Sequence, residues 1–222
     1  EYSLTLNMNG SGSGTLEVSS PGPYYYGTMI TVWANASLGS TFTGFYGSLS
    51  GMTSPRTLTF DGDEVVTAEF ALSEYSLTLN MNGSGSGTLE VSSPGPYYYG
   101  SVITVWANAS VGSMFTGFYG SLMGTTSPQT LVFDGNEMVT AEFTLSTYSL
   151  TLSMNGSGFG TLEVSSPGPY YYGSAITVWA NASLGSTFTG FYGSLTGMVS
   201  PQILTFDGDE VVTAEFALSE YS

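Results

Sequence analysis

The stretch Thr67 to Gly85 decides the fold. It reads TAEFALSEYSLTLNMNGSG, and it returns at Thr140 to Gly158 as TAEFTLSTYSLTLSMNGSG. Val66, Ala68 and Phe70 alternate with polar neighbours, and the same alternation resumes after a short Ser-Glu link. Alternation with period two is typical of a half-buried strand. The pattern therefore predicts a strand that runs out of one unit and into the next with almost no linker.

The first half of this stretch occurs a third time, at 213–222, so that its copies start at 67, 140 and 213 and are 73 residues apart (140 − 67 and 213 − 140). The chain thus divides into three units at 1–73, 74–146 and 147–219, and residues 220–222 begin a further copy. This periodicity overrides the length-based prior of one or two domains. Because the chain does not start with Met and stops inside another copy, we expect a window cut from a longer periodic polypeptide.

The charge balance excludes several classes of function. The chain has 17 acidic residues, a single Arg (Arg56), and no Lys, His or Cys, which gives a formal net charge of −16. Nucleic acids and anionic lipid surfaces need Lys and Arg, so neither is an expected partner. Residues 1–222 contain no apolar run long enough to span a membrane as a helix and no signal-peptide pattern, so we expect any targeting or anchoring segment to lie outside this window. A surface rich in Ser, Thr, Asn and Gly suits an extracellular location.

Each unit reads as five or six short strands, mostly antiparallel, so the expected fold class is all-β. We expect a first hairpin between Tyr2–Met8 and Thr15–Val18 with a glycine-rich tip, and a second around the turn Asp61-Gly62-Asp63. In the strand 28–36, Ile30, Val32 and Ala34 lie on one face and Trp33 on the other. In so small a unit we nevertheless expect the large rings of Phe45 and Trp33 to serve the core.

The order of these signals resembles the divergent internalin B-repeat modules of bacterial and archaeal surface proteins. The matching segments of the first unit are 2–6, Asn9-Gly10-Ser11-Gly12, Pro21-Gly22, Tyr26-Gly27, 30–34, 39–45, Asp61-Gly62-Asp63 and Thr67-Ala68-Glu69-Phe70. Phe45 stands where the family usually has Trp, and the basic residues common in its last strand are missing. The resemblance implies a compact, β-grasp-like module used in tandem as a stalk or an adhesive surface, and it implies no catalytic residue.

Catalysis has few side chains to use, and we expect no enzyme activity. The acidic turns are the nearest candidates for a metal site. Their role is more simply a turn, because Asp-Gly suits a tight reversal. Weak calcium binding is the alternative, and no other cofactor is expected. The candidate calcium ligands are Asp61, Asp63, Glu64, Asp207, Asp209 and Glu210.

Two glycosylation sequons recur in each unit, and a run of three tyrosines does as well. A sequon accepts an N-linked glycan only if it is exposed and the glycosylation machinery is present; otherwise it is a chance pattern in an Asn- and Ser-rich chain. The sequon residues are Asn35, Asn108 and Asn181, and Asn9, Asn82 and Asn155. Outward tyrosines would contact a sugar or a protein. The tyrosines are Tyr24, Tyr25 and Tyr26; Tyr97, Tyr98 and Tyr99; and Tyr170, Tyr171 and Tyr172.

These features together favour a structural repeat protein of an extracellular filament, sheath or stalk, built from head-to-tail β modules and partnered mainly by itself. The alternative is a cell-surface adhesin whose repeats bind a glycan or another surface protein through exposed tyrosines. The adjoining strands at each unit boundary have two interpretations: a continuous strand that couples the units, or a first strand that completes the sheet of the preceding unit.

Overall fold

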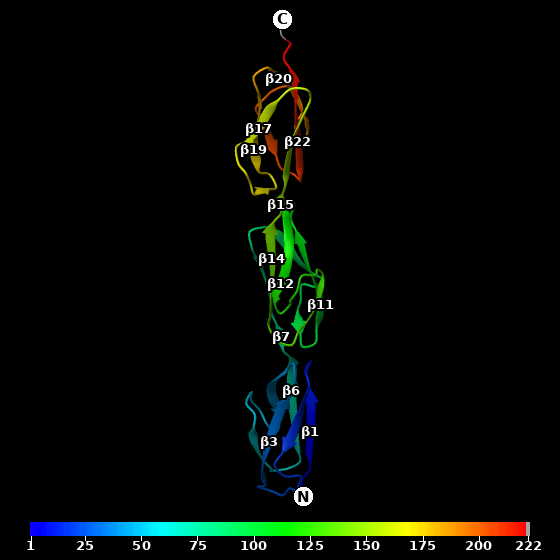
Figure 1. Ribbon diagram of the computed structural model, residues 1–222. Coiled ribbons are helices and arrows are strands. Elements are labelled where there is room, and N and C mark those ends of the chain that lie inside the picture. Colours follow the sequence, from blue (N-terminus) through cyan, green and yellow to red (C-terminus); the bar gives the residue numbers. More distant parts are fainter. Residues whose placement is uncertain (221–222) are drawn as a thin grey trace. The chain divides into compact units, whose positions relative to one another are not determined.

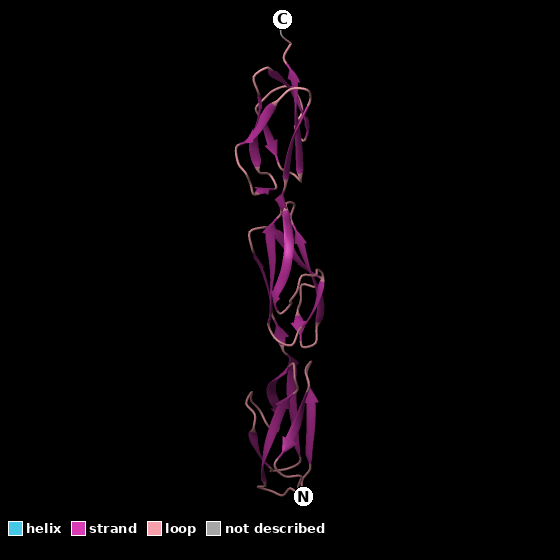
Figure 2. Cartoon of the chain, in the orientation of Figure 1, coloured by secondary structure: helices cyan, strands magenta, loops and turns pink. Residues whose placement is uncertain are grey.

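The computed structural model describes residues 1–220, and the last two residues of the predicted further copy lie outside that range. Every regular element among the described residues is a β-strand (Figure 2). The strands follow the sequence repeat, six to a repeat, with additional two-residue strands at and near the repeat boundaries (Figure 1). None of the described residues forms a helix long and apolar enough to cross a membrane.

The strand bounds repeat almost residue for residue. The first repeat has β1 (Leu4–Asn9), β2 (Gly14–Val18), β3 (Met29–Ala36), β4 (Ser40–Gly47), β5 (Arg56–Thr59) and β6 (Glu64–Leu72). After β7 (Glu74–Tyr75), the second has β8 (Leu77–Asn82), β9 (Gly87–Val91), β10 (Tyr97–Tyr98), β11 (Val102–Ala109), β12 (Ser113–Gly120), β13 (Gln129–Val132) and β14 (Glu137–Leu145). After β15 (Thr147–Tyr148), the third has β16 (Leu150–Asn155), β17 (Gly160–Val164), β18 (Tyr170–Tyr171), β19 (Ala175–Ala182), β20 (Ser186–Gly193), β21 (Gln202–Thr205) and β22 (Glu210–Leu218).

Two three-stranded sheets form the first repeat. One sheet has the order β1-β6-β4, in which β1 lies parallel to β6 and β4 antiparallel to it. The other has the order β2-β3-β5 and is antiparallel throughout. The third repeat has the same two sheets, β16-β22-β20 and β17-β19-β21. The prediction of an all-β array with mostly antiparallel strands is confirmed.

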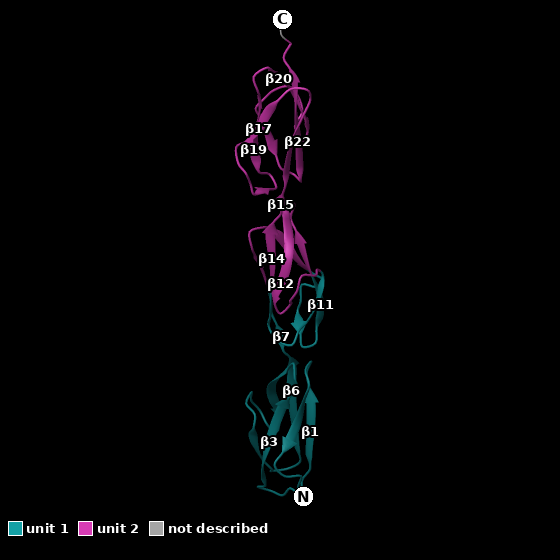
Figure 3. Ribbon diagram, viewed as in Figure 1, with its two compact units in different colours: residues 1–78, 91–105, 128–139 teal, residues 79–90, 106–127, 140–222 magenta. Residues whose placement is uncertain are grey.

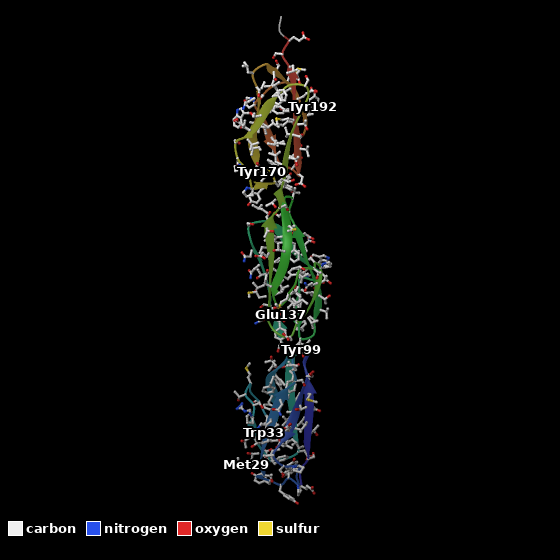
Figure 4. All side chains as sticks on the ribbon, viewed as in Figure 1. Met29, Trp33, Tyr99, Glu137, Tyr170 and Tyr192 are labelled. Carbon is white, nitrogen blue, oxygen red and sulfur yellow. The ribbon has the colours of Figure 1, made fainter. Side chains whose placement is uncertain are left out.

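One apolar core lies between the two sheets of each of these repeats. In the first, the inward residues of β3 meet those of β6, while Phe45 and Phe60 are almost completely buried. Along both strands buried residues alternate with exposed or half-buried ones, as the period-two pattern predicts. Phe45 is a core residue, as expected. Trp33 is only half-buried on the outward face of β3, so its predicted core role is wrong (Figure 4).

Both predicted hairpins are wrong. β1 and β2 belong to different sheets, and so do β5 and β6. The glycine-rich segment therefore crosses from one sheet to the other, and Gly12 donates its backbone N–H to the Phe70 carbonyl at 2.9 Å on the way. Glycine suits this crossing because Gly10 has a φ of +102° and any Cβ there would collide with the Phe70 backbone.

The strand at the unit boundary also differs from both interpretations. It is interrupted at Ser73 and Ser76, which separate β6, β7 and β8. Strand addition to the preceding unit is wrong, because β1 pairs with β6 of its own repeat and β16 with β22. Instead, β7 pairs antiparallel with β10, Tyr75 opposite Tyr97.

The chain divides by contact density into two compact units (Figure 3). The first comprises 1–78, 91–105 and 128–139, and the second 79–90, 106–127 and 140–222. Each unit contains one whole terminal repeat and one boundary between repeats. The boundary between the first two repeats therefore lies within the first compact unit, and the boundary between the second and third repeats lies within the second.

Candidate functional site at the repeat joints

The three tyrosines of each run have different environments. Tyr24 is buried and stacks on Phe60 with ring centroids 4.2 Å apart, and its hydroxyl donates to the Ser20 carbonyl at 2.7 Å. Its counterparts Tyr97 and Tyr170 are buried and stacked in the same way. The prediction that these tyrosines serve an interaction therefore needs correction, because Tyr24, Tyr97 and Tyr170 belong to the core. Only the second and third tyrosines of each run reach the surface.

In the second and third runs, the third tyrosine lies against a loop glycine of the preceding repeat. In the first compact unit, a Cβ added to Gly39 would meet the Cβ of Tyr99 and would lie 2.8 Å from its Cγ. In the second unit, Gly112 has the same relation to Tyr172, with the added Cβ 2.7 Å from Cγ. Real Cβ atoms essentially never approach another atom so closely. Both glycines also have positive φ, +75° and +76°, so each is required by its backbone conformation and by its neighbour.

Hydrogen bonds fix the glycine loop to the end of its own repeat. Ser73 donates its backbone N–H to the Gly39 carbonyl at 2.9 Å, and the hydroxyls of Ser73 and Thr41 are 2.8 Å apart. Ser146 bonds to the Gly112 carbonyl in the same way, also at 2.9 Å. We call each such set a joint: the first comprises Leu38–Ser40, Ser73–Tyr75 and Tyr97–Tyr99, and the second comprises their counterparts 73 residues later.

The exposed fraction of the third tyrosine shows how much of its side chain the joint buries. Tyr26 begins the series and is 80% exposed, whereas Tyr99 and Tyr172 are 44% and 48% exposed (Tyr99 is labelled in Figure 4). The three side chains are otherwise equivalent in sequence. About a third of the tyrosine surface is therefore covered by the preceding repeat.

The acidic turns connect two distant segments of the same repeat through hydrogen bonds. Asp63 accepts hydrogen bonds from the backbone N–H of Ser3 at 2.7 Å and from its hydroxyl at 3.0 Å. These bonds lower the pKa of Asp63, and Ser149 lowers the pKa of Asp209 in the same way. In the second repeat the acceptor is the amide oxygen of Asn136, 2.9 Å from the Ser76 nitrogen. Asp63 thereby ties the start of β1 to the start of β6.

The other predicted calcium candidates do not gather around Asp63. Glu64 is buried and lies 3.3 Å from the backbone nitrogen of Asp61, from which it accepts a hydrogen bond. Glu210 accepts a longer bond from Asp207, at 3.5 Å. Within residues 1–220, no group of three or more His, Cys, Asp or Glu side chains is arranged to hold a metal ion.

The sequon residues are all exposed. Asn35 and its counterparts Asn108 and Asn181 lie near the ends of long strands. Asn9 ends β1, and its side-chain oxygen accepts a hydrogen bond from the Gly10 backbone at 2.8 Å. Asn82 and Asn155 make the same bond at 2.7 Å. The second set is thus tied to the local backbone.

A polar hollow that the sequence analysis missed lies on the outer face of β6. Asn9, Tyr46, Thr67 and Glu69 line a hollow of about 290 Å³. The Tyr46 hydroxyl donates to Glu69 Oε2 at 2.9 Å, and that hydrogen bond raises the pKa of Tyr46. The same bond recurs at 3.0 Å from Tyr119 and from Tyr192, which is labelled in Figure 4. The sequence contains no signal of this pairing, because Tyr46 and Glu69 lie 23 residues apart and on different strands, β4 and β6.

The fold and the joints define a class of protein: a tandem array of small two-sheet β modules, joined through contacts that recur from repeat to repeat. The chain belongs to the divergent InlB B-repeat domain family, whose model matches residues 2–74, 75–147 and 150–220. Domains of this family are typical of surface proteins and are generally not enzymes.

A solved structure, the Bacillus anthracis TIE protein, is similar to this chain with a TM-score of 0.51 and 7% sequence identity. The similarity covers 97% of this chain and 50% of that one, so this chain spans half the length of its structural relative. At this identity the likeness concerns the fold alone. The comparison with curated proteins finds no match.

Proposed function

We propose that this chain is a non-enzymatic structural segment of an extracellular filament, sheath or stalk, in which the joints couple successive repeats. The observation that carries the proposal is the recurring joint itself. Gly39 against Tyr99 and Gly112 against Tyr172 use the same contact, and β7 and β15 make the same short pairing. A flexible linker between independent binding modules would need neither a specific glycine nor a specific tyrosine.

The surface chemistry supports an extracellular role. Only 8% of residues are charged, and a single Arg is the only site for a trypsin-like protease. Such a surface differs from the mixed Lys and Glu surface that keeps typical soluble domains dispersed. Membership of a family typical of surface proteins points in the same direction.

Immunogold electron microscopy on native cells tests this proposal. Antibodies raised against this chain should label filaments, a sheath or stalks outside the cell envelope. Mass spectrometry of the same material would show whether the Asn35 peptide carries a glycan. Label confined to the cell interior would overturn the proposal.

An adhesin remains the second candidate, and the polar hollow at Tyr46 is the observation that favours it. A half-exposed aromatic ring beside a carboxylate and an amide offers both stacking and hydrogen bonds to a sugar. In that case Tyr46, Tyr119 and Tyr192 would bind the glycan, and the tyrosine runs would not. A glycan array probed with the wild-type chain and with Tyr46→Ala, Tyr119→Ala and Tyr192→Ala combined would decide it. Binding that the triple variant loses supports the adhesin, and an array without binding argues against it.

A further inference from the structure

We propose that the sequon residue Asn35 carries an N-linked glycan whose first sugar stacks on the ring of Trp33, and that the other two repeats carry the same modification. The ligand is a neutral pyranose that is attached to this chain itself. The inference rests on the extracellular location proposed above and adds a modification site to it. The residue pairs are Trp33 and Asn35, Trp106 and Asn108, and Trp179 and Asn181.

The tryptophan and the sequon residue share the outer face of one strand. Residues two apart on a strand point to the same side, so Trp33 and Asn35 both lie on the face of β3 opposite to the buried Ala34. Trp33 is half-buried and Asn35 is exposed, and the other two pairs have the same exposure. The two positions are about 7 Å apart along the strand. A sugar on the Asn35 side chain can therefore fold back over the indole ring.

Stacking is favourable because the outward tryptophan presents apolar surface to solvent. One face of a pyranose ring carries mainly C–H groups, and such a face packs well on the face of an aromatic ring. Covering apolar surface in this way stabilises the folded chain. The outward position of Trp33 on β3 thus acquires a role as the support of the first sugar.

Strand β2 supplies polar partners for this sugar. Thr15 lies directly opposite Asn35 in the antiparallel register of β2 and β3. Glu17 lies directly opposite Trp33. Opposed residues have Cβ atoms about 4.5–5.5 Å apart, so a hydroxyl and a carboxylate border the covered ring and can bond to sugar hydroxyls. The carboxylate, in a chain of net charge −16, favours a neutral sugar over an acidic one. The third repeat has the same register, with Thr161 opposite Asn181 and Glu163 opposite Trp179.

The sequon end of this face is constant from repeat to repeat, whereas the other end varies. Met29, at the start of β3, is replaced by Val in the second repeat and by Ala in the third. Trp33 and the sequon Asn35-Ala36-Ser37 recur unchanged in all three repeats. The outer face therefore accepts changes of side-chain size only away from the proposed site.

Hydrogen bonds distinguish the Asn35 sequon from the Asn9 sequon. The side-chain oxygen of Asn9 accepts a bond from the Gly10 backbone, and the hydroxyl of Ser11 accepts one from the Leu72 backbone at 3.2 Å. Within residues 1–220, no such bond engages the side chains of Asn35 and Ser37. The Asn35 sequon is thus the one whose amide and hydroxyl are both available, and we assign the glycan to it.

Attachment of the glycan consumes a donor in which C1 of the sugar is linked to a lipid phosphate. The bond between C1 and the phosphate oxygen breaks, and a bond between C1 and Asn35 Nδ2 forms. The amide proton leaves with the released lipid phosphate. The sequence Asn-x-Ser is the acceptor that such a transfer requires.

Mass spectrometry of the native surface material tests the site. Peptides that contain Asn35 and its counterparts should carry the glycan, and peptides that contain Asn9 and its counterparts should not. A native chain without sugar on the Asn35 set would overturn the site. The proposed structural role would survive that result, because immunogold microscopy locates the chain whether or not it is modified.

Acrylamide quenching of tryptophan fluorescence tests the stacking. The three tryptophans of the chain are Trp33, Trp106 and Trp179, so this signal reports on no other position. Relative to the same chain made in a host without N-glycosylation, the quenching constant of the native chain should fall by about half, because the sugar covers the outward face of the ring. Equal quenching of a glycosylated and an unglycosylated chain would refute the stacking.

Two sets of variants, made in a host with N-glycosylation machinery, assign the effect to one sequon. Asn35→Gln, Asn108→Gln and Asn181→Gln combined should restore the quenching of the unglycosylated chain. Asn9→Gln, Asn82→Gln and Asn155→Gln combined are the matched control and should quench like the glycosylated wild type. Protection of the tryptophans that the control set loses, and the first set keeps, would contradict the assignment to Asn35.

Discussion

Replacing Gly39 with Ala should open the joint between the first two repeats. The added methyl group would meet Tyr99, 2.8 Å from its Cγ, while the backbone keeps a positive φ that disfavours any L side chain. The two effects can be separated because Gly27 provides a matched control. Its φ is +82°, and nothing lies within 4 Å of a Cβ added there. Gly27→Ala thus introduces the backbone strain without the collision.

The size of the effect follows from the surface that the joint covers. Tyr99 is 44% exposed and Tyr26 80%, so opening the joint uncovers about a third of a side chain of roughly 200 Å², or ~70 Å². At about 25 cal/mol per Å², this burial stabilises the joint by ~1.8 kcal/mol. Losing it should raise the population of the open joint about 20-fold.

Proteolysis by a glutamyl endopeptidase measures that population, because Glu74 lies in the first joint while Thr147 replaces it in the second. When opening and closing are fast, cleavage after Glu74 tracks the fraction of open joint. Gly39→Ala should therefore be cut there about 20-fold faster than wild type, with Gly27→Ala close to wild type. Equal cleavage of the two variants would refute the reasoning, because backbone strain alone would then account for the effect.

Three further predictions concern titration and modification. Hydrogen bonds from Ser3 lower the pKa of Asp63 from its ordinary value of 3.8. The ionised carboxylate therefore stabilises the fold above pH 3.8, and this stabilisation is lost as the pH falls through the lowered pKa. Asp63→Asn, which copies the natural Asn136, should make the urea midpoint of unfolding less sensitive to acid. The hydrogen bond to Glu69 raises the pKa of Tyr46, so ultraviolet titration should show this tyrosine ionising at a lower pH in Glu69→Gln than in the wild type. The wild type should also lose stability as the pH rises above 10.0, the ordinary pKa of tyrosine, because the unfolded chain then gives up this proton before the folded one does. In a host with N-glycosylation machinery, mass spectrometry should find a glycan on Asn35 and its counterparts, and Asn35→Gln should lose it.

Much of the fold could be predicted from local patterns. The alternation around Phe70 and Val32 identified strands and their buried faces correctly, because side chains alternate across any strand whatever its partners. Repetition of the sequence also established the tandem organisation. The family resemblance came from short motifs in a fixed order, and the family model matches all three repeats.

The candidate site was predicted only in part. The sequence predicted an interaction through the tyrosine runs, but three adjacent aromatic residues do not reveal which one faces the core. Tyr24 is held there by Phe60, which is distant in sequence. The glycine partner of Tyr99 had no signal of its own, because Gly39 looked like any loop glycine.

What the sequence alone determined is the class of each segment: strand, turn, inward or outward face, and the repeat that multiplies them. Only the tertiary structure decided which strands pair, and it replaced both expected hairpins with crossings between two sheets. Alternation is a property of neighbouring residues, whereas pairing depends on how loops such as Asn9–Gly14 and Asp61–Asp63 carry the chain across the core. The joints belong to the same category, because each exists only where a tyrosine meets a glycine that is distant in sequence: Tyr99 against Gly39, and Tyr172 against Gly112.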